Sequence, residues 1–110
     1  MVKVPFPFSE RQAVKGRPAV VLSKPEFQDQ SGHVVLTMVT SAQRSTWPLD
    51  WPIQDLEVAG LQRPCLIRLK IFTLDQRLVL KPLGRLGLAD QLGVKLRLNA
   101  LLAEADPKIS

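Results

Sequence analysis

The chain contains a single cysteine, Cys65, and a single histidine, His33. One cysteine excludes an internal disulfide bond, and one Cys with one His cannot form a Cys/His zinc site. Long apolar runs are also missing. The uninterrupted stretches cover only a few residues, such as Ala19 to Leu22, whereas a transmembrane helix needs roughly 20. No basic region followed by an apolar run and a small-residue cleavage site opens the chain. These absences predict a soluble cytoplasmic protein without a structural metal or a membrane anchor.

What is present suits one globular domain. The chain has 110 residues, of which 45% are hydrophobic and 23% charged. A disordered tail would be poorer in apolar residues, so we expect a single domain spanning 1–110. There are 15 Lys and Arg against 10 Asp and Glu, a net charge of +5. This sign favours a polyanionic partner, either a nucleic acid or an acidic protein.

The charges lie in blocks. Residues 1–24 carry five Lys or Arg and one Glu, and residues 63–88 carry six Lys or Arg and one Asp. The segment between them, residues 25–62, carries five acidic side chains and one Arg. If the two basic blocks meet in the fold, they form a basic surface that the net charge understates.

Several segments have the patterns of short strands. Residues 2–8 and 64–72 alternate, as half-buried strands do. In the second of these, one face carries Cys65, Ile67, Leu69 and Ile71, and the other carries Leu66, Arg68, Lys70 and Phe72. Residues 18–23 and 33–40 are apolar and rich in β-branched side chains, which also predicts strands. We expect loops over 24–32 and, with a short strand near Ile53, over 41–63, where two X-Pro bonds occur.

The C-terminal part differs. Residues 78–86 form an apolar segment that Pro82 and Gly84 interrupt, and the proline-free residues 88–105 predict a helix. Its apolar arc is wider than one helix contact needs, because Leu88, Leu92 and Leu96 extend the face of Val94 and Leu98. Gly93 costs this helix about 1 kcal/mol relative to Ala. Two interpretations of the wide arc are open: the helix covers the end of a barrel, or part of the arc packs on another chain. The predicted fold is mainly β with one C-terminal helix, a small β-barrel that the helix closes.

Four segments carry a resemblance. Residues 4–23, VPFPFSERQAVKGRPAVVLS, resemble the opening of the PemK/MazF family of toxin–antitoxin ribonucleases, and residues 60–75, GLQRPCLIRLKIFTLD, are similar to a later part of the same family. Val39-Thr40-Ser41 and Gly84-Arg85-Leu86 fit two further positions. The resemblance implies an SH3-like barrel of the CcdB/MazF type, a homodimer, metal-independent cleavage of single-stranded RNA without any cofactor, and neutralisation by a cognate antitoxin.

Metal-free RNA cleavage uses the 2′-hydroxyl as an internal nucleophile, and cations stabilise the negative phosphorane. The resemblance implies a catalytic role for Arg17, whose planar fork can hold two phosphate oxygens, and for Thr40 and Arg68. The alternatives are a loop arginine in solvent for Arg17, a packing threonine for Thr40 and an ordinary strand arginine on a solvent face for Arg68. Further residues are candidates for RNA contacts without sequence readout: Arg11, Lys15, Ser41, Arg44 and Lys70.

The sequence departs from the family pattern near Arg68. Relatives often carry a carboxylate two residues after this arginine, in the order Arg-Leu-Asp-Lys. This chain has Arg68-Leu69-Lys70, so the Asp is either deleted or replaced. Glu10 and Lys70 are the candidates that could replace it as the general base. Trp47 and Trp51 in the middle loop either stack on unpaired bases or anchor the loop, and we expect at least one of them to be an anchor.

The sequence therefore predicts a sequence-selective endoribonuclease toxin. A catalytically impaired member that only binds RNA or antitoxin is the first alternative, because the carboxylate is missing. The second alternative is a gyrase poison like CcdB, which binds its target through C-terminal aromatic residues. No residue after Phe72 is aromatic, which argues against the gyrase poison.

Overall fold

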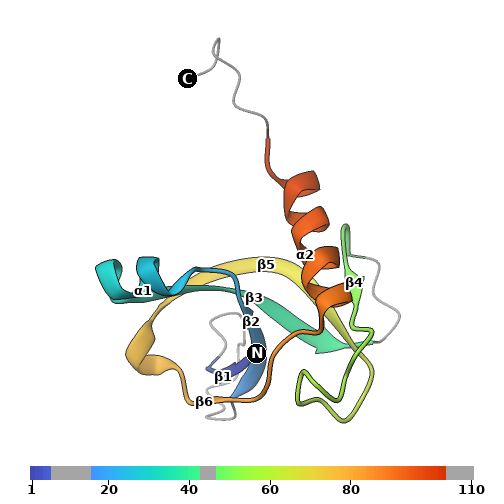
Figure 1. The fold of residues 1–110 in the computed structure, drawn as a ribbon, viewed down its shortest axis with the longest axis horizontal. Helices are drawn as coiled ribbons and strands as arrows, with labels where there is room; N and C mark the ends of the chain where they lie inside the picture. Colours follow the sequence, from blue (N-terminus) through green and yellow to red (C-terminus); the bar gives the residue numbers. More distant parts are fainter. Residues whose placement is uncertain (6–15, 43–46, 104–110) are drawn as a thin grey trace.

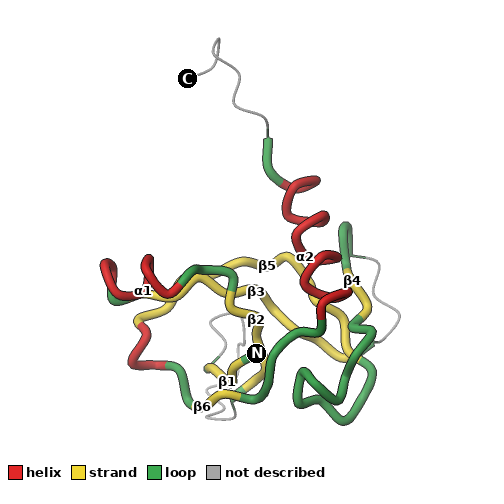
Figure 2. The backbone as a smooth tube through the Cα atoms, in the orientation of Figure 1, coloured by secondary structure: helices red, strands yellow, loops and turns green. Residues whose placement is uncertain are grey.

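The computed structural model describes residues 1–5, 16–42 and 47–103. One antiparallel sheet dominates it, with the strand order β4-β5-β3-β2-β1-β6 (Figures 1 and 2). The strands are β1 (Val2–Val4), β2 (Arg17–Val21), β3 (His33–Ser41), β4 (Trp51–Pro52), β5 (Cys65–Asp75) and β6 (Lys81–Pro82). The helices are α1 (Pro25–Ser31), the single-turn η1 (Gln76–Leu78) and α2 (Leu88–Leu101).

Both faces of the sheet are apolar at its centre, because alternate residues of each strand point to opposite sides. On one side, which we call the α2 face, Val20, Val39 and Ile67 pack with Val94 of α2. The other side, which we call the far face, has a separate apolar cluster of Val4, Ala19, Val34, Leu36 and Phe72. The opposite faces predicted for Ile67 and Phe72 are thus confirmed, with Ile67 in one cluster and Phe72 in the other.

A bulge interrupts the pairing of β3 with β5. Thr37 lies opposite Ile71, but the next residue of β3, Met38, lies opposite Arg68. Leu69 and Lys70 are therefore the extra residues of β5. A bulge bends the strand that contains it and re-aims nearby side chains, and this one comes immediately after Arg68.

The prediction of a mainly β fold with a C-terminal helix is confirmed, and the short strand near Ile53 is found as β4. Among the described strands, β4 and β6 form the two edges of the sheet, and no pairing between them closes a barrel. Of the predicted strand over 2–8, β1 covers Val2–Val4, and residues 6–8 lie outside the described part. No helix of the described residues is long and apolar enough to cross a membrane.

The largest differences from the predicted boundaries concern α1, β5 and α2, while β2, predicted over 18–23, is Arg17–Val21. The prediction of a loop over 24–32 was wrong, because α1 occupies most of this segment. Its signals are a proline in the first turn, Glu26 beside it, and Gly32 at the C-terminus with a φ of 70° that glycine adopts readily. β5 continues to Asp75, beyond the predicted end at residue 72. α2 ends at Leu101 rather than at residue 105.

Candidate active site

The guanidinium of Arg68 is the best-held cation of the far face. Its Nε donates to Oδ1 of Asp50 at 3.2 Å, and its Nη2 donates to Oδ2 at 2.9 Å. The two side chains are only 10% and 12% exposed. Two parallel N–H···O bonds fix the plane of the guanidinium as well as its position. Arg68 is therefore held in one orientation by a residue from a different part of the chain.

The backbone of Arg68 is held as well. The hydroxyl of Thr37, which is fully buried, donates to the carbonyl oxygen of Arg68 at 2.5 Å. This bond lies at the bulge, where Thr37 and Met38 of β3 face residues of β5 that are not adjacent in sequence. Arg68 is thus fixed at its carbonyl by β3 and at its side chain by Asp50.

Asp50 reaches Arg68 through a tight turn. The amide of Asp50 donates to the carbonyl oxygen of Trp47 at 3.4 Å, which closes a four-residue turn with Pro48 second and Leu49 third. Leu49 has a φ of 65°. A positive φ at the third position defines a type II turn, where glycine is favoured and leucine is strained.

Trp47 stands at the other end of this turn. Its indole is 41% exposed, with Nζ of Lys70 4.7 Å and Cζ of Arg68 5.6 Å from the ring centroid. Both distances are within the range of cation–π attraction. The turn therefore brings an aromatic ring, Trp47, and a carboxylate, Asp50, into contact with the guanidinium of Arg68.

Arg17 and Thr40 belong to the same face as Arg68. Arg17 shares the parity of Ala19 in β2, and Thr40 shares that of Leu36 in β3, so both lie on the far face. The sheet register aligns Ala19 with Met38 and Met38 with Arg68. Adjacent strands are about 4.8 Å apart, so the backbones of β2 and β5 lie about 10 Å apart across β3. Long side chains from both strands can therefore approach one phosphate.

We call Arg17, Thr40 and Arg68, which lie on the far face of three adjacent strands, the far-face row. The burial and position of each predicted residue differ. Arg17 is exposed, Thr40 is half-buried opposite Leu66, and Ser41 is exposed opposite Cys65 at the end of β3. Lys70 is half-buried beside Trp47. Arg11, Lys15 and Arg44, together with Glu10, lie outside the described residues. The geometry thus brings Arg17, Thr40, Arg68 and Lys70 to one face.

Trp51 has the anchoring role expected of one of the two tryptophans. Its Nε1 donates to Oδ1 of Asp90 in α2 at 2.8 Å, and its ring fills the space where a side chain on Gly93 would be. Asp90 is fully buried and also accepts from the amides of Gln54 and Asp55 at 2.8 and 3.0 Å. Burial on its own raises the pKa of Asp90, but these three hydrogen bonds outweigh it and lower the pKa.

Two carboxylates of this region, Asp50 and Asp90, were not predicted from the sequence. The only local sequence signal for Asp50 is its position immediately after Trp-Pro-Leu. Acidic residues are common in the first turn of a helix, so nothing in the sequence indicates that Asp90 contacts a distant loop. Cys65 is partly buried against the α2-face cluster, and burial raises the pKa of its thiol. No group of three or more potential metal ligands is found within the described ranges.

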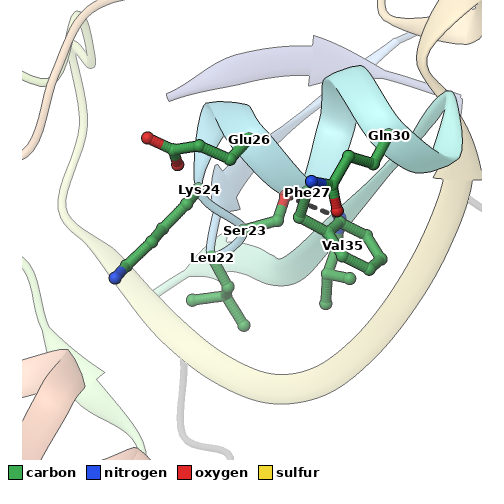
Figure 3. Close-up of a pocket in the computed structure, with 7 residues that line it drawn as sticks. All are labelled: Leu22, Ser23, Lys24, Glu26, Phe27, Gln30 and Val35. Atoms are coloured by element: carbon green, nitrogen blue, oxygen red, sulfur yellow. Dashed lines mark hydrogen bonds between the residues drawn. The ribbon is translucent and has the colours of Figure 1, made fainter.

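A cavity of about 430 Å³ lies away from the far-face row, between α1, β3 and the connection that follows β2 (Figure 3). Leu22, Phe27 and Val35 form its apolar wall, and Lys24, Glu26 and Gln30 lie at its rim. The hydroxyl of Ser23 accepts a hydrogen bond from the amide of Val35 beneath it. None of the predicted catalytic side chains lines this cavity.

The described fold is that of the MazF-like toxins. The toxin MazF-mt6 of Mycobacterium tuberculosis aligns with a TM-score of 0.69 at 17% identity, covering 94% of this chain and 98% of that chain. An endoribonuclease in complex with its cognate antitoxin, from a mycobacterial species, aligns with a TM-score of 0.73 at 16% identity, covering 96% and 93%. The MazE–MazF complex of Deinococcus radiodurans gives 0.70 at 20% identity, covering 94% and 91%.

The family itself is shown by sequence. The model for the PemK-like, MazF-like toxin of type II toxin–antitoxin systems matches residues 1–102. A search of curated proteins gave no significant match. The chain belongs to the PemK-like, MazF-like toxin family, and the resemblance noted in its sequence is confirmed.

Proposed function

We propose that this toxin is a metal-independent, sequence-selective endoribonuclease that cleaves single-stranded RNA in the cytoplasm. The observation that carries the proposal is the shared far face of Arg17, Thr40 and Arg68, on adjacent strands of a MazF-like fold. An endoribonuclease is also among the structures that share this fold.

In this mechanism the 2′-hydroxyl of the RNA attacks the adjacent phosphate. Arg17 and Arg68 donate to the phosphate oxygens and stabilise the charge of the phosphorane. The hydroxyl of Thr40 binds a phosphate oxygen or the 2′-hydroxyl. The 2′-hydroxyl gives its proton to a general base, for which Glu10 and Lys70 are the candidates, and the bond from phosphorus to the 5′-oxygen breaks. The departing 5′-oxygen takes up a proton, so cleavage leaves a 2′,3′-cyclic phosphate and a free 5′-hydroxyl. DNA, which lacks the 2′-hydroxyl, is not cut.

Ser41 and Lys70 contact neighbouring phosphates in this proposal. Lys70 lies beside Trp47 on the far face. Ser41 has the parity of Val39 and lies opposite Cys65, so its contact is made from the α2 face at the end of β3. Arg11, Lys15 and Arg44 supply further phosphate contacts that position the RNA without reading its sequence. The basic blocks 1–24 and 63–88 contribute β1, β2 and β5, which gives this part of the sheet its excess of cations.

Two protein partners follow from the same proposal. A cognate antitoxin neutralises the toxin, as the structures of a toxin with its antitoxin and of MazE–MazF suggest for this chain. A second copy of the chain forms a homodimer. Leu88, Leu92 and Leu96 of α2 are 74%, 55% and 63% exposed on one stripe of the helix. A contiguous apolar stripe of this kind is rare on a monomer and typical of an interface.

The test uses purified protein with a labelled single-stranded RNA and a DNA of the same sequence. We expect cuts only in the RNA, unaffected by excess EDTA, with termini that carry a cyclic phosphate on one side and a hydroxyl on the other. Cleavage that EDTA abolishes and magnesium restores would overturn the mechanism.

A catalytically impaired binding protein is the second candidate. It is favoured by the pairing of Arg68 with Asp50, which neutralises one of the two central cations, and by Lys70 in the place of the family carboxylate. Salt-sensitive RNA binding without any new termini would support this candidate instead. Trapped gyrase cleavage complexes would support the CcdB-like alternative, against which the lack of aromatic residues after Phe72 counts.

A further inference from the structure

We propose that Asp50 is a positioning residue of the active site: it binds one edge of the Arg68 guanidinium and thereby directs the other edge to the RNA phosphate. The inference rests on the proposed function, because it gives Arg68 its contact with RNA. Asp50 itself does not touch the substrate.

The hydrogen bonds of Arg68 define the two edges. A guanidinium has five N–H donors in a rigid plane. Asp50 takes one donor of Nε and one of Nη2, which leaves the donors on the Nη1 side. No side-chain nitrogen or oxygen that is buried within the described residues lacks a partner. The described residues provide no acceptor for Nη1, so in this proposal Nη1 donates to a phosphate oxygen.

The surroundings of Arg68 restrict it to this orientation. The Thr37 hydroxyl fixes its carbonyl at the bulge, and Trp47 lies across the guanidinium at 5.6 Å. A charge so largely buried is costly without a partner, so the guanidinium has little freedom to leave Asp50. The edge that remains free belongs to the far face, where Arg17 and Thr40 also lie.

The backbone of the turn supports a functional role. Leu49 has a left-handed φ of 65° immediately before Asp50, a conformation that is unfavourable for a residue with a Cβ. A glycine at this position would remove that cost. Such outliers persist where the surrounding structure imposes them and cluster at functional sites. Here the residue with the unfavourable conformation is Leu49, which belongs to the turn that brings Asp50 next to Arg68.

The sign of the charge makes the role testable. The Asp50 carboxylate repels an RNA phosphate near Arg68, so removing its charge favours the binding of RNA. The same change frees the guanidinium from its fixed orientation and lowers turnover. Misplacing a catalytic group by about 1 Å can cost roughly 10²-fold in rate. Positioning therefore predicts a split in which turnover falls and affinity does not.

The experiment compares Asp50→Asn, Asp50→Glu and the control Asp55→Asn in the full chain. Asp55 is an exposed carboxylate of the following loop, so its variant makes the same change in net charge. We expect Asp50→Asn to lower kcat at saturating RNA by about 10- to 100-fold without weakening RNA binding. Asp50→Glu should recover part of kcat, and Asp55→Asn should behave as wild type.

Two further measurements separate positioning from mere folding support. In the Arg68→Ala background, Asp50→Asn should have no additional effect on kcat, since Asp50 acts through Arg68. By NMR, the Nε–H of Arg68 should exchange slowly with water in the wild type and rapidly in Asp50→Asn. An equal loss of kcat with and without Arg68, or an unchanged Nε–H signal, would overturn the inference. If the wild type cuts no RNA, the proposed function fails, while the NMR comparison still decides whether Asp50 holds Arg68.

Discussion

The indole Nε1 of Trp51 donates to the carboxylate of Asp90 at 2.8 Å, joining β4 to the first turn of α2. Gly93, one turn further along α2, leaves the space in which the ring of Trp51 lies. The sequence presents Gly93 as a weakness of the helix. Because position 93 has no side chain, α2 can approach β4 closely. The helix α2 and the strand β4 therefore pack as one unit.

Asp90→Asn should lower the free energy of unfolding by about 1–3 kcal/mol, because an amide in this place leaves buried N–H donors unsatisfied. The pKa of Asp90 is lowered in the folded state, so its stabilisation is complete above the unfolded pKa of about 3.9 and is lost as the pH falls through the folded pKa. Urea unfolding at pH 7 and at stepwise lower pH measures this. A wild-type advantage that grew on acidification would contradict the assignment.

How much of this molecule could be read from its sequence depends on the range of the interactions. Strand periodicity gave β3 and β5 and their faces, because alternation is a local property. The pairing of Arg68 with Asp50 spans 18 residues and that of Trp51 with Asp90 spans 39, and no local pattern encodes either. Pro25 and Gly32 did signal α1 locally, but the short segment lacks the apolar periodicity that normally identifies a helix.

Arg17→Ala should reduce RNA cleavage by roughly 10²- to 10³-fold, the usual effect of losing one preorganised charge contact in the transition state. Its melting temperature should stay close to that of the wild type, because Arg17 is exposed. Arg85→Ala is the matched control, since Arg85 is also exposed but lies after β6, outside the far-face row. Equal cleavage rates for the two variants would remove Arg17 from the mechanism.

Leu92→Glu should convert the protein from a dimer to a monomer. Leu92 is 55% exposed on α2, so a charge there disturbs a partner's surface more than the fold of the chain itself. Light scattering at micromolar concentration should give twice the 12.3 kDa chain mass for the wild type and the single chain mass for the variant. Leu80→Glu, at the same exposed fraction of 55% but outside α2, is the control. A wild type that is monomeric at this concentration would count against the homodimer.

Lys70→Asp should raise turnover at saturating RNA and weaken RNA binding. Lys70 lies two residues after Arg68 on the same face, beside Trp47, so aspartate there introduces a proton acceptor next to the reacting phosphate. General acid–base catalysis is worth about 10²- to 10⁴-fold, which sets the upper limit of the gain. The change also replaces a cation with an anion, so affinity for the RNA falls and the comparison must use saturating RNA.

Lys70→Ala separates these two effects, because it removes the cation without supplying a carboxylate. A kcat for Lys70→Asp above that of Lys70→Ala would show that the new carboxylate contributes to the chemistry. A kcat at or below that of Lys70→Ala means that position 70 cannot take a base. If both variants fall well below the wild type at saturating RNA, Lys70 acts in the chemical step itself, because a residue that only binds phosphate changes KM and leaves kcat unchanged.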